Sequence, residues 1–265
     1  MAVRRSPQWS SEMREDLIYD VGMHNGDDTA YYLSRGFRVV AIEANPELIA
    51  QANVRFSGAL RAGTLTMLHV GIGPREEVAT FWINDLKTEW SSFIKEVGCR
   101  DGTPCHPVAV PCTRLGHIFT QHGVPFYLKI DIEGHDRSCL EDIDPTDAPT
   151  FVSVEAHSPD YLSILARAGY DAFKLISQTW FTQPGPRRLS SLGRTGRGLL
   201  RRLAQIRPIV LGRWVFPRGS SGPFGEQSEG PWRSLEETTA MWRALPQDDW
   251  FDFHATRGRD LGRRQ

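Results

Sequence analysis

Short apolar runs alternate with amphipathic segments over most of the first 180 residues. The apolar runs are rich in branched and aromatic side chains, which favour strands. They lie at 18–21, 38–43, 65–70, 126–131, 151–155 and 172–176. Helical spacing of apolar positions fills the intervals at 29–35, 46–56, 114–122, 136–141 and 159–168. This alternation predicts an α/β fold in which a mostly parallel sheet carries helices on both faces.

The remaining segments are less regular. Residues 1–16 are polar and predict a loosely docked helix. Alternating positions at 77–83 and 108–112 predict two extra strands around a long loop, a feature that is often functional. We expect a single domain over 1–265. Its parts are a core at 17–180, a Gly-, Pro- and Arg-rich insertion at 183–212, and a C-terminal part at 213–265 with a strand at 213–216 and a helix at 235–245.

The charge balance excludes one class of partner. The chain has 31 Lys and Arg against 32 Asp and Glu, a formal net charge of −1, so we expect no nucleic-acid partner. No apolar run reaches the ~20 residues of a membrane span. Cys99, Cys105, Cys112 and Cys139 form no C-x-x-C pair, so we expect no disulfide-forming compartment. These features predict a cytoplasmic protein.

A glycine turn between the first two predicted strands is the most informative motif. In the run from Asp20 to Thr29, Gly22 and Gly26 follow a strand, and Glu43 ends the next strand. Glycines let the backbone approach a ligand, and an acid at that strand end can accept both hydroxyls of a ribose. The G-x-x-x-G spacing differs from that of dinucleotide folds, and Asp20 would repel a pyrophosphate but attract an ammonium group. The turn predicts S-adenosylmethionine; the alternative is an ordinary helix-capping turn.

A second motif, Lys129-Ile130-Asp131-Ile132-Glu133-Gly134, ends a central strand. Ligands of open α/β sheets bind at the carboxyl ends of the strands. Lys129 and Asp131 share a face because side chains alternate along a strand. The three ionisable groups predict catalytic chemistry. The alternative is a Lys129–Asp131 ion pair with an acid at a helix start.

A third predicted strand, at 151–155, also ends in polar groups, namely Glu155 and, two residues later, His157. If this strand is the next along the sheet, Glu155 lies near Asp131. Asp131 and Glu155 are then candidate ligands of an optional Mg²⁺ or Mn²⁺, and His157 is a candidate base. The alternative for His157 is an ordinary histidine at a loop edge.

Together these motifs resemble the FkbM family of S-adenosylmethionine-dependent methyltransferases, a branch of the class I Rossmann-like methyltransferases. The resemblance covers about residues 17–180 and lies in 20–29, 41–46, 70–73, 129–136 and 154–155. It implies a seven-stranded sheet and methylation of hydroxyl groups, often on sugars or natural products. The family's D-V-G-A-N-x-G becomes D-V-G-M-H-N-G here, with His24 in place of the family's asparagine.

The resemblance and the motifs assign roles to individual residues. The expected cofactor contacts are Asp20, Gly22, His24, Asn25, Gly26, Thr29, Glu43, Asn45, Gly71, Ile72, Ser92 and Asp131, with Gly71 and Ile72 beside the adenine. The expected catalytic residues are Asp131, Glu133, His135 and His157, with one of the two histidines as proton acceptor.

The predicted function is methyl transfer from S-adenosylmethionine to a hydroxyl of a sugar, glycolipid or glycosylated natural product. Two alternatives are a nicotinamide-dependent oxidoreductase and a non-catalytic binding module with a degenerate methyltransferase fold. Residues 90–93 and 222–226 are candidate rims of the acceptor pocket. Arginines interleaved with leucines at 187–213 predict either a solvated excursion, a lid over the acceptor or weak contact with an anionic membrane surface. A homodimer is compatible with the sequence.

Overall fold

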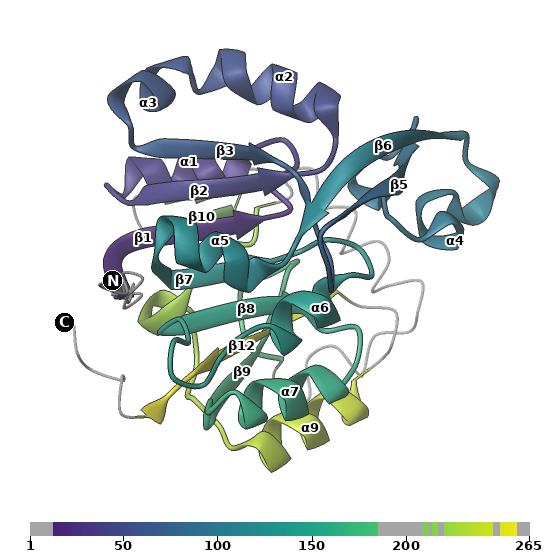
Figure 1. The fold of residues 1–265 in the computed structure, drawn as a ribbon. Coiled ribbons are helices and arrows are strands. Elements are labelled where there is room, and N and C mark those ends of the chain that lie inside the picture. Colours follow the sequence, from purple (N-terminus) through teal and green to yellow (C-terminus); the bar gives the residue numbers. More distant parts are fainter. Residues whose placement is uncertain (1–12, 185–208, 212–213, 217–219, 246–249, 259–265) are drawn as a thin grey trace, which may run out of the picture.

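The computed structural model describes residues 13–184, 209–211, 214–216, 220–245 and 250–258. Its centre is a seven-stranded sheet with the strand order β3-β2-β1-β7-β8-β12-β9 (Figure 1). The strands are β1 (Met13–Val21), β2 (Arg38–Glu43), β3 (Leu65–His69), β7 (Val124–Ile130), β8 (Phe151–Glu155), β9 (Ala172–Ser177) and β12 (Phe251–Thr256). Neighbours are parallel except where β12 pairs with β8 and β9. The predicted Rossmann-like α/β fold is confirmed.

Side-chain alternation divides the core between the two faces of the sheet. In β1, Leu17, Tyr19 and Val21 point to one face and Ile18 to the other. The first face packs against α5 (Leu115–His122), α6 (Asp136–Glu141), α7 (Asp160–Arg167) and α9 (Leu235–Ala244). The second packs against α1 (Asp27–Ser34), α2 (Pro46–Arg55) and α3 (Ser57–Ala62). The strands read as nearly continuous apolar runs because both faces are covered.

The C-terminal strand differs from the prediction. We expected 213–216 to be the last strand, but β11 (Trp214–Phe216) pairs with β10 (Ile209–Leu211) in a separate two-stranded sheet. The main sheet is instead completed by β12, which sets Asp252 opposite Glu155. All six residues of β12 are buried although three of them, Asp252, His254 and Thr256, are polar. Alternating polar residues at a chain end resemble a solvated tail, which is why the strand was missed.

Several expectations concern the ends and the Arg-rich segment. β1 begins at Met13, so residues 13–16 extend a strand and not a helix. Residues 1–12, 185–208 and 212–213 lie outside the described residues, so the N-terminal helix and the membrane contact of 187–213 stay predictions. In the described ranges, no helix has the length and apolar character needed to cross a bilayer. The cytoplasmic location stays a prediction as well.

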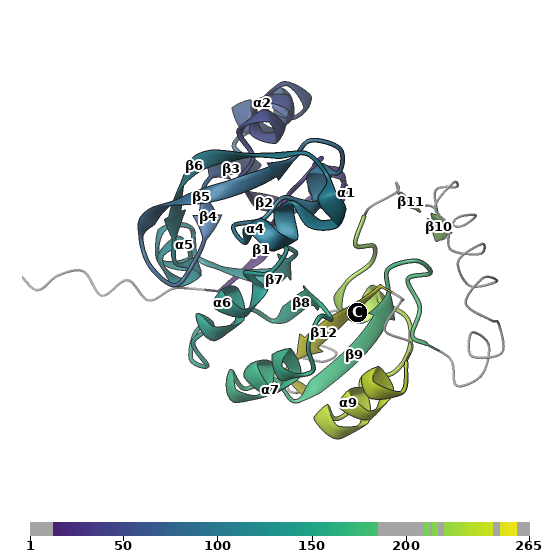
Figure 2. The ribbon, with the colours of Figure 1, turned by 90° about the vertical axis from the view of Figure 1, so that its right-hand side faces the viewer.

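The long insertion forms a second sheet that projects from one end of the main sheet (Figures 1 and 2). The two extra strands that the alternation predicted are β5 (Glu77–Asn84) and β6 (Cys105–Thr113). They pair antiparallel along their length, and β4 (Gly71–Ile72) joins β6 in parallel. The connection between β5 and β6 holds η1 (Thr88–Trp90), α4 (Lys95–Gly98) and η2 (Arg100–Gly102).

A disulfide between Cys99 and Cys105 closes the far end of this insertion. The cysteine spacing, from which we expected no disulfide-forming compartment, did not predict this bridge. The chain turns back at η2, which brings the two Cα atoms to 5.5 Å, within the range of a disulfide. Cys112 and Cys139 are free and buried. The bridge encloses Arg100 and so restricts the backbone that carries this side chain.

Candidate active site

Lys129 lies at the centre of a group of acids at the carboxyl ends of β1 and β7. Its Nζ donates to Asp20 Oδ1 at 3.1 Å and to the carbonyl oxygen of Gly22 at 3.0 Å. The same ammonium lies 3.6 Å from Asp28 Oδ2 and 3.7 Å from Asp131 Oδ2. The register of the two adjacent strands pairs Asp20 with Lys129 directly. The predicted Lys129–Asp131 ion pair is thus one part of a larger cluster.

This cluster holds more acidic groups than basic groups. Burial alone would lower the pKa of Lys129, but Asp20, Asp131 and Asp28 together raise that pKa well above its ordinary value. Burial raises the pKa of Asp28 in spite of the nearby ammonium. One cation therefore faces three carboxyl groups. This surplus of acids favours a positively charged ligand at this edge of the sheet.

Asp20 itself is not available to a ligand. It is fully buried, and its Oδ2 accepts a hydrogen bond from Thr29 Oγ1 at 2.7 Å while Oδ1 accepts from Lys129. We predicted direct cofactor contacts for Asp20 and Thr29, with Asp20 holding the ammonium group of the cofactor. The structure corrects this prediction, because the ammonium that Asp20 holds belongs to Lys129. Asp131 reaches solvent instead, with 37% of its side chain exposed.

The two glycines of the turn make room for protein atoms. Gly22 has φ +81°, and a Cβ there would lie 1.8 Å from the carbonyl oxygen of Asp131. Gly26 has φ +80°, and a Cβ there would lie 2.6 Å from the ring of Phe56. Backbone conformation and close packing therefore require glycine at both positions. Their predicted contacts with a cofactor stay predictions.

Two other side chains of the turn already have protein partners. His24 Nε2 lies 2.9 Å from Thr88 Oγ1, a contact between the turn and the insertion. Asn25 Oδ1 accepts from the backbone N–H of Asp27 at 3.0 Å, and its amide donates to the Asp27 carboxylate at 3.1 Å. Asn25 therefore forms an Asx turn just ahead of α1, whose N-cap is Gly26 and has no side-chain capping hydrogen bond, unlike the helix-capping turn considered as the alternative.

Glu43 offers free acceptor capacity at the end of β2. Its Oε2 accepts the backbone N–H of His24 and its Oε1 accepts that of Asn45, each at 2.8 Å. Each carboxylate oxygen retains a second lone pair for another donor. Burial raises the pKa of Glu43, and the two N–H donors oppose that shift.

Beside Glu43, the side chain of Asn45 has an unused donor. Asn45 Oδ1 accepts the backbone N–H of Glu47 at 2.9 Å at the start of α2. The Nδ2 atom of the same amide is buried and has no hydrogen-bond partner in the described part of the chain. Leaving a buried donor unpaired costs about 1–3 kcal/mol. The position of this amide next to Glu43 marks a site where a ligand can supply the missing acceptor.

The structure also corrects the expected adenine contacts. A Cβ on Gly71 would lie 2.2 Å from the ring of Phe93, so the absent side chain admits this phenylalanine. Ile72 is 2% exposed and belongs to the core under α5. Its carbonyl oxygen lies 3.2 Å from His135 Nδ1. Gly71 and Ile72 therefore organise the protein around His135 and present no open surface to an adenine.

Glu133 is held in place by the insertion. Both terminal nitrogens of Arg100 donate to its carboxylate oxygens, each at 3.0 Å. Ser92, fully buried, donates from Oγ to the carbonyl oxygen of Glu133 at 2.6 Å. Glu133 has φ +45°, which is uncommon for a residue with a side chain. Ser92 thus fixes the loop that presents Glu133, and we find no free Ser92 hydroxyl for a cofactor in this arrangement.

The protonation of Glu133 is poised near neutral pH. Burial raises its pKa to about 7, although the hydrogen bonds from Arg100 oppose the shift. The nearby carboxyl groups of Glu155 and Asp131 raise it as well. A general base is most effective when its pKa lies near the working pH. Glu133 therefore combines a fixed position with a suitable proton affinity.

The two candidate histidines differ in their surroundings. His135 Nδ1 faces the carbonyl oxygen of Ile72, which can only accept, so Nδ1 carries the proton and Nε2 keeps its lone pair. His157 Nε2 instead lies 3.0 Å from Glu155 Oε2, and this hydrogen bond raises the pKa of His157 to about 9. His157 is therefore an imidazolium at neutral pH. The role of His157 as the base stays a prediction.

The predicted divalent ion at Asp131 and Glu155 is not supported either. Among the residues that the structure describes, no group of three or more His, Cys, Asp or Glu side chains is arranged to hold a metal ion. Glu155 pairs with the charged ring of His157, and Asp131 lies beside the ammonium of Lys129. A divalent cation at either carboxylate would be repelled by the positive group already there.

The sequence matches the methyltransferase FkbM domain over residues 20–172. The chain belongs to the FkbM methyltransferase family. The matched stretch of this FkbM domain holds the residues described so far, from Asp20 on β1 to His157 after β8. Comparison with curated proteins found no match.

Several solved structures resemble this FkbM domain. The FkbM methyltransferase of Methylobacillus flagellatus KT is 18% identical, with a TM-score of 0.40, and the match covers 59% of this chain and 37% of that chain. Precorrin-6y C5,15-methyltransferase of Geobacter metallireducens GS-15 is 9% identical, with a TM-score of 0.38 over 93% and 83% of the two chains. A SAM-dependent methyltransferase of Geobacter sulfurreducens in complex with S-adenosyl-L-homocysteine is 12% identical, with a TM-score of 0.33. The match covers 93% of this chain and 86% of that chain.

Three residues of the FkbM site escaped the sequence analysis. Asp28 accepts from Ser220 Oγ at 2.6 Å and from the backbone N–H of Ser221 at 2.8 Å, partners almost two hundred positions away. Asp28 directly follows Asp27 at the start of α1, and the sequence analysis assigned both acids to the glycine turn. Arg100 lies in the segment between 77–83 and 108–112, for which the sequence predicted a long loop. Its pairing with Glu133 depends on how the insertion folds back.

The third missed residue, Asp252, comes from β12. Its buried carboxyl accepts a hydrogen bond from Gln178 Nε2. Burial, with further contributions from Asp131 and Glu155, raises its pKa well above the ordinary value. The neighbouring acids and the burial both favour the neutral form of this carboxyl group. Because β12 comes last in the chain and runs antiparallel, its first residues lie at the carboxyl ends of the parallel strands.

The two segments predicted to form rims of the acceptor pocket differ in how deeply they are buried in this FkbM structure. Trp90 is half-buried, with Lys87 Nζ 3.5 Å and Arg100 Cζ 4.4 Å from its ring centroid, and its role as a rim stays a prediction. The other segment, 222–226, leads into η3 (Gly225–Gln227) and is buried up to Gly225. The ring of Phe224 stacks on the ring of Tyr127, with 4.0 Å between the ring centroids. This second rim is therefore core packing, apart from the exposed Glu226.

Proposed function

We propose that this FkbM-family chain transfers the methyl group of S-adenosylmethionine to a hydroxyl of a sugar, glycolipid or glycosylated natural product. The observation that carries the proposal is the surplus of acids around Lys129, which suits a ligand bearing a sulfonium and an ammonium. The free lone pairs of Glu43 and the unpaired Asn45 amide suit a ribose and its neighbouring polar atoms. Asp131, partly exposed, is the acid of the cluster open to the ammonium.

The chain's own residues account for the remaining chemistry. S-adenosylmethionine supplies a methyl group that is already activated by its positively charged sulfur. A sugar hydroxyl is a weak nucleophile at neutral pH, and a base assists it by removing its proton. We assign this role to Glu133, whose pKa is raised to about 7. Holding the reacting groups in line supplies about 7–11 kcal/mol of the barrier reduction.

Calorimetric titration with S-adenosylhomocysteine and, separately, with NADH tests the proposed cofactor. We expect S-adenosylhomocysteine to bind at micromolar concentrations and NADH to give no heat. The reverse result would support the oxidoreductase alternative. Binding of S-adenosylhomocysteine without transfer of tritiated methyl groups to a panel of oligosaccharides, glycolipids and glycosylated small molecules would favour the non-catalytic alternative.

The pH dependence of methyl transfer tests the base. Because the carboxylate is the active form, we expect the rate to fall about tenfold per pH unit as pH drops below about 7, the pKa of Glu133. Arg100 lowers that pKa, so Arg100→Gln removes the cation and moves the fall in rate to higher pH. Arg75→Gln is a matched control, because Arg75 lies on the same insertion, its side chain is 74% exposed and it pairs with Glu77.

A second variant separates Glu133 from His135. Glu133→Gln should slow transfer by about 100- to 10,000-fold and abolish the fall in rate near pH 7. His135 is the second candidate because its Nε2 lone pair is free of the Ile72 contact. If His135→Asn and not Glu133→Gln removes the pH dependence, the base is His135.

A further inference from the structure

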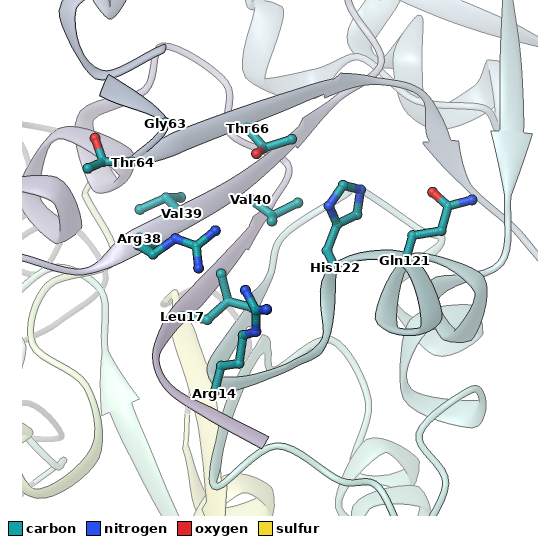
Figure 3. Close-up of a pocket in the computed structure, with 10 residues that line it drawn as sticks. All are labelled: Arg14, Leu17, Arg38, Val39, Val40, Gly63, Thr64, Thr66, Gln121 and His122. Carbon is teal, nitrogen blue, oxygen red and sulfur yellow. The ribbon is translucent and has the colours of Figure 1, made fainter. Parts of the chain in front are cut away.

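A cavity of about 180 Å³ lies at the edge of the sheet opposite to the acids of the site (Figure 3). The starts of β1, β2 and β3 and the last turn of α5 surround it. Arg14 and Asp20 are both on β1, six residues apart, which corresponds to about 20 Å of extended chain. The cavity is therefore separate from the proposed methyl-transfer site and independent of it.

The lining of this cavity carries positive charge without a counter-ion. The side chains of Arg14 and Arg38 point into it from neighbouring strands, with His122 on the far side (Figure 3). No carboxylate lines it: Glu15 and Asp16, next to Arg14 in sequence, are not among its wall residues. In the described part of the chain, neither Arg14 nor Arg38 has an ion pair or a side-chain hydrogen bond.

Several other arginines in the described part of the chain pair with carboxylates. Arg55 pairs with Asp27, Arg100 with Glu133, and Arg137 with Glu141. Arg14 and Arg38 are themselves exposed to solvent, and two guanidinium groups that face one cavity favour an anion placed between them. The two unpaired guanidinium groups therefore indicate where an anion would be stabilised.

The neighbouring side chains add hydrogen-bonding capacity. His122 is half-buried, and burial together with the nearby charge of Arg14 lowers its pKa. A neutral imidazole still provides one N–H donor. The hydroxyl group of Thr66 provides one more donor on the β3 side of the cavity, whereas the hydroxyl of Thr64 donates to the carbonyl oxygen of Ala59.

We propose that this cavity binds a phosphate group, either as inorganic phosphate or as the phosphate of a small monoester. The planar N–H pairs of arginine match the oxygens of a phosphate, and two arginines balance its double negative charge. The volume limits the size of the ligand. Sites for drug-sized ligands occupy about 300–1,000 Å³, whereas this cavity suits a phosphate with little attached to it.

Calorimetric titration of the full chain with sodium phosphate, against sodium chloride at equal ionic strength, tests the proposal. We expect phosphate to bind the wild type and each of Arg14→Gln and Arg38→Gln to weaken binding at least tenfold. Arg61→Gln is the matched control: Arg61 is an exposed arginine of α3 near the cavity but not part of its wall. It should change the affinity less than twofold. No binding by the wild type at millimolar phosphate, or equal losses in all three variants, would overturn the proposal.

Two further measurements separate loss of binding from loss of folding and identify the source of the phosphate. Phosphate should raise the melting temperature of the wild type and of Arg61→Gln but not of Arg14→Gln or Arg38→Gln, whose melting temperatures without phosphate should match the wild type. Glycerol 3-phosphate and vesicles of phosphatidic acid in phosphatidylcholine then distinguish the source. Competition by glycerol 3-phosphate alone assigns a soluble monoester, whereas vesicle binding that Arg38→Gln abolishes assigns a lipid phosphate. Phosphate binding unaffected by either arginine variant contradicts the site.

Discussion

Replacing Glu43 by alanine should weaken the binding of S-adenosylmethionine by about 100-fold or more. Glu43 is the acid at the end of β2 whose two oxygens each keep a free lone pair. A hydrogen bond to a charged group contributes about 1.5–3 kcal/mol, and two ribose hydroxyls would lose such a bond together. Isothermal titration calorimetry with S-adenosylmethionine and S-adenosylhomocysteine measures the loss for both.

The choice of variants separates ligand binding from folding. The Glu43 carboxylate also accepts the N–H groups of His24 and Asn45, so alanine loosens the turn as well. Glu43→Gln keeps one acceptor oxygen and should lose less affinity than alanine. Glu47→Ala removes an exposed acid from the first turn of α2 and should leave the affinity unchanged. Wild-type affinity in Glu43→Ala would remove this residue from the ribose site.

Replacing Lys129 by methionine should destabilise the protein by about 3–5 kcal/mol. The change removes the cation from a cluster in which Asp20 and Asp28 are almost completely buried. Removing one partner of a buried ion pair leaves an uncompensated charge, and this accounts for the size of the loss. The pKa of Lys129 is raised well above its ordinary value, so its ammonium is fully present in the wild type at pH 7. Urea denaturation at pH 7 measures the difference.

A double variant identifies the source of that loss. Asp28→Asn removes one carboxylate from the cluster, so adding it to Lys129→Met should recover part of the lost stability. Lys95→Met is the control for removing a lysine: Lys95 is exposed and lies over the ring of Trp82, and its loss should cost less than about 1 kcal/mol. Equal effects of Lys129→Met and Lys95→Met would show that the cluster is not held together by Lys129.

The cluster also explains how the catalytic and cofactor sides of the site are joined. Lys129 draws together the ends of β1 and β7 and the start of α1, while Arg100 brings the insertion onto Glu133. The disulfide of Cys99 and Cys105 restricts the segment that carries Arg100. The position of Glu133 therefore depends on a part of the chain outside the main sheet. If Glu133 is the proton acceptor that we propose, its support from an insertion lets that part of the site vary while the sheet stays the same.

The sequence alone determined the α/β sheet, because buried parallel strands must be apolar on both faces and glycines must occupy the positive-φ turns. It also determined that Glu43, Lys129, Asp131 and Glu133 lie at the carboxyl edge, since a strand's direction places its last residues there. These conclusions need only local periodicity and chain direction. They hold whatever the side chains contact.

Only the tertiary structure decided which of those polar groups face each other. Asp20 is paired with Lys129 because the adjacent strands β1 and β7 set these two residues side by side. Asp252 entered the site from the far end of the chain through an antiparallel strand. Contacts between residues distant in sequence depend on strand order and on how the insertion folds back, and the spacing of residues along the chain encodes neither.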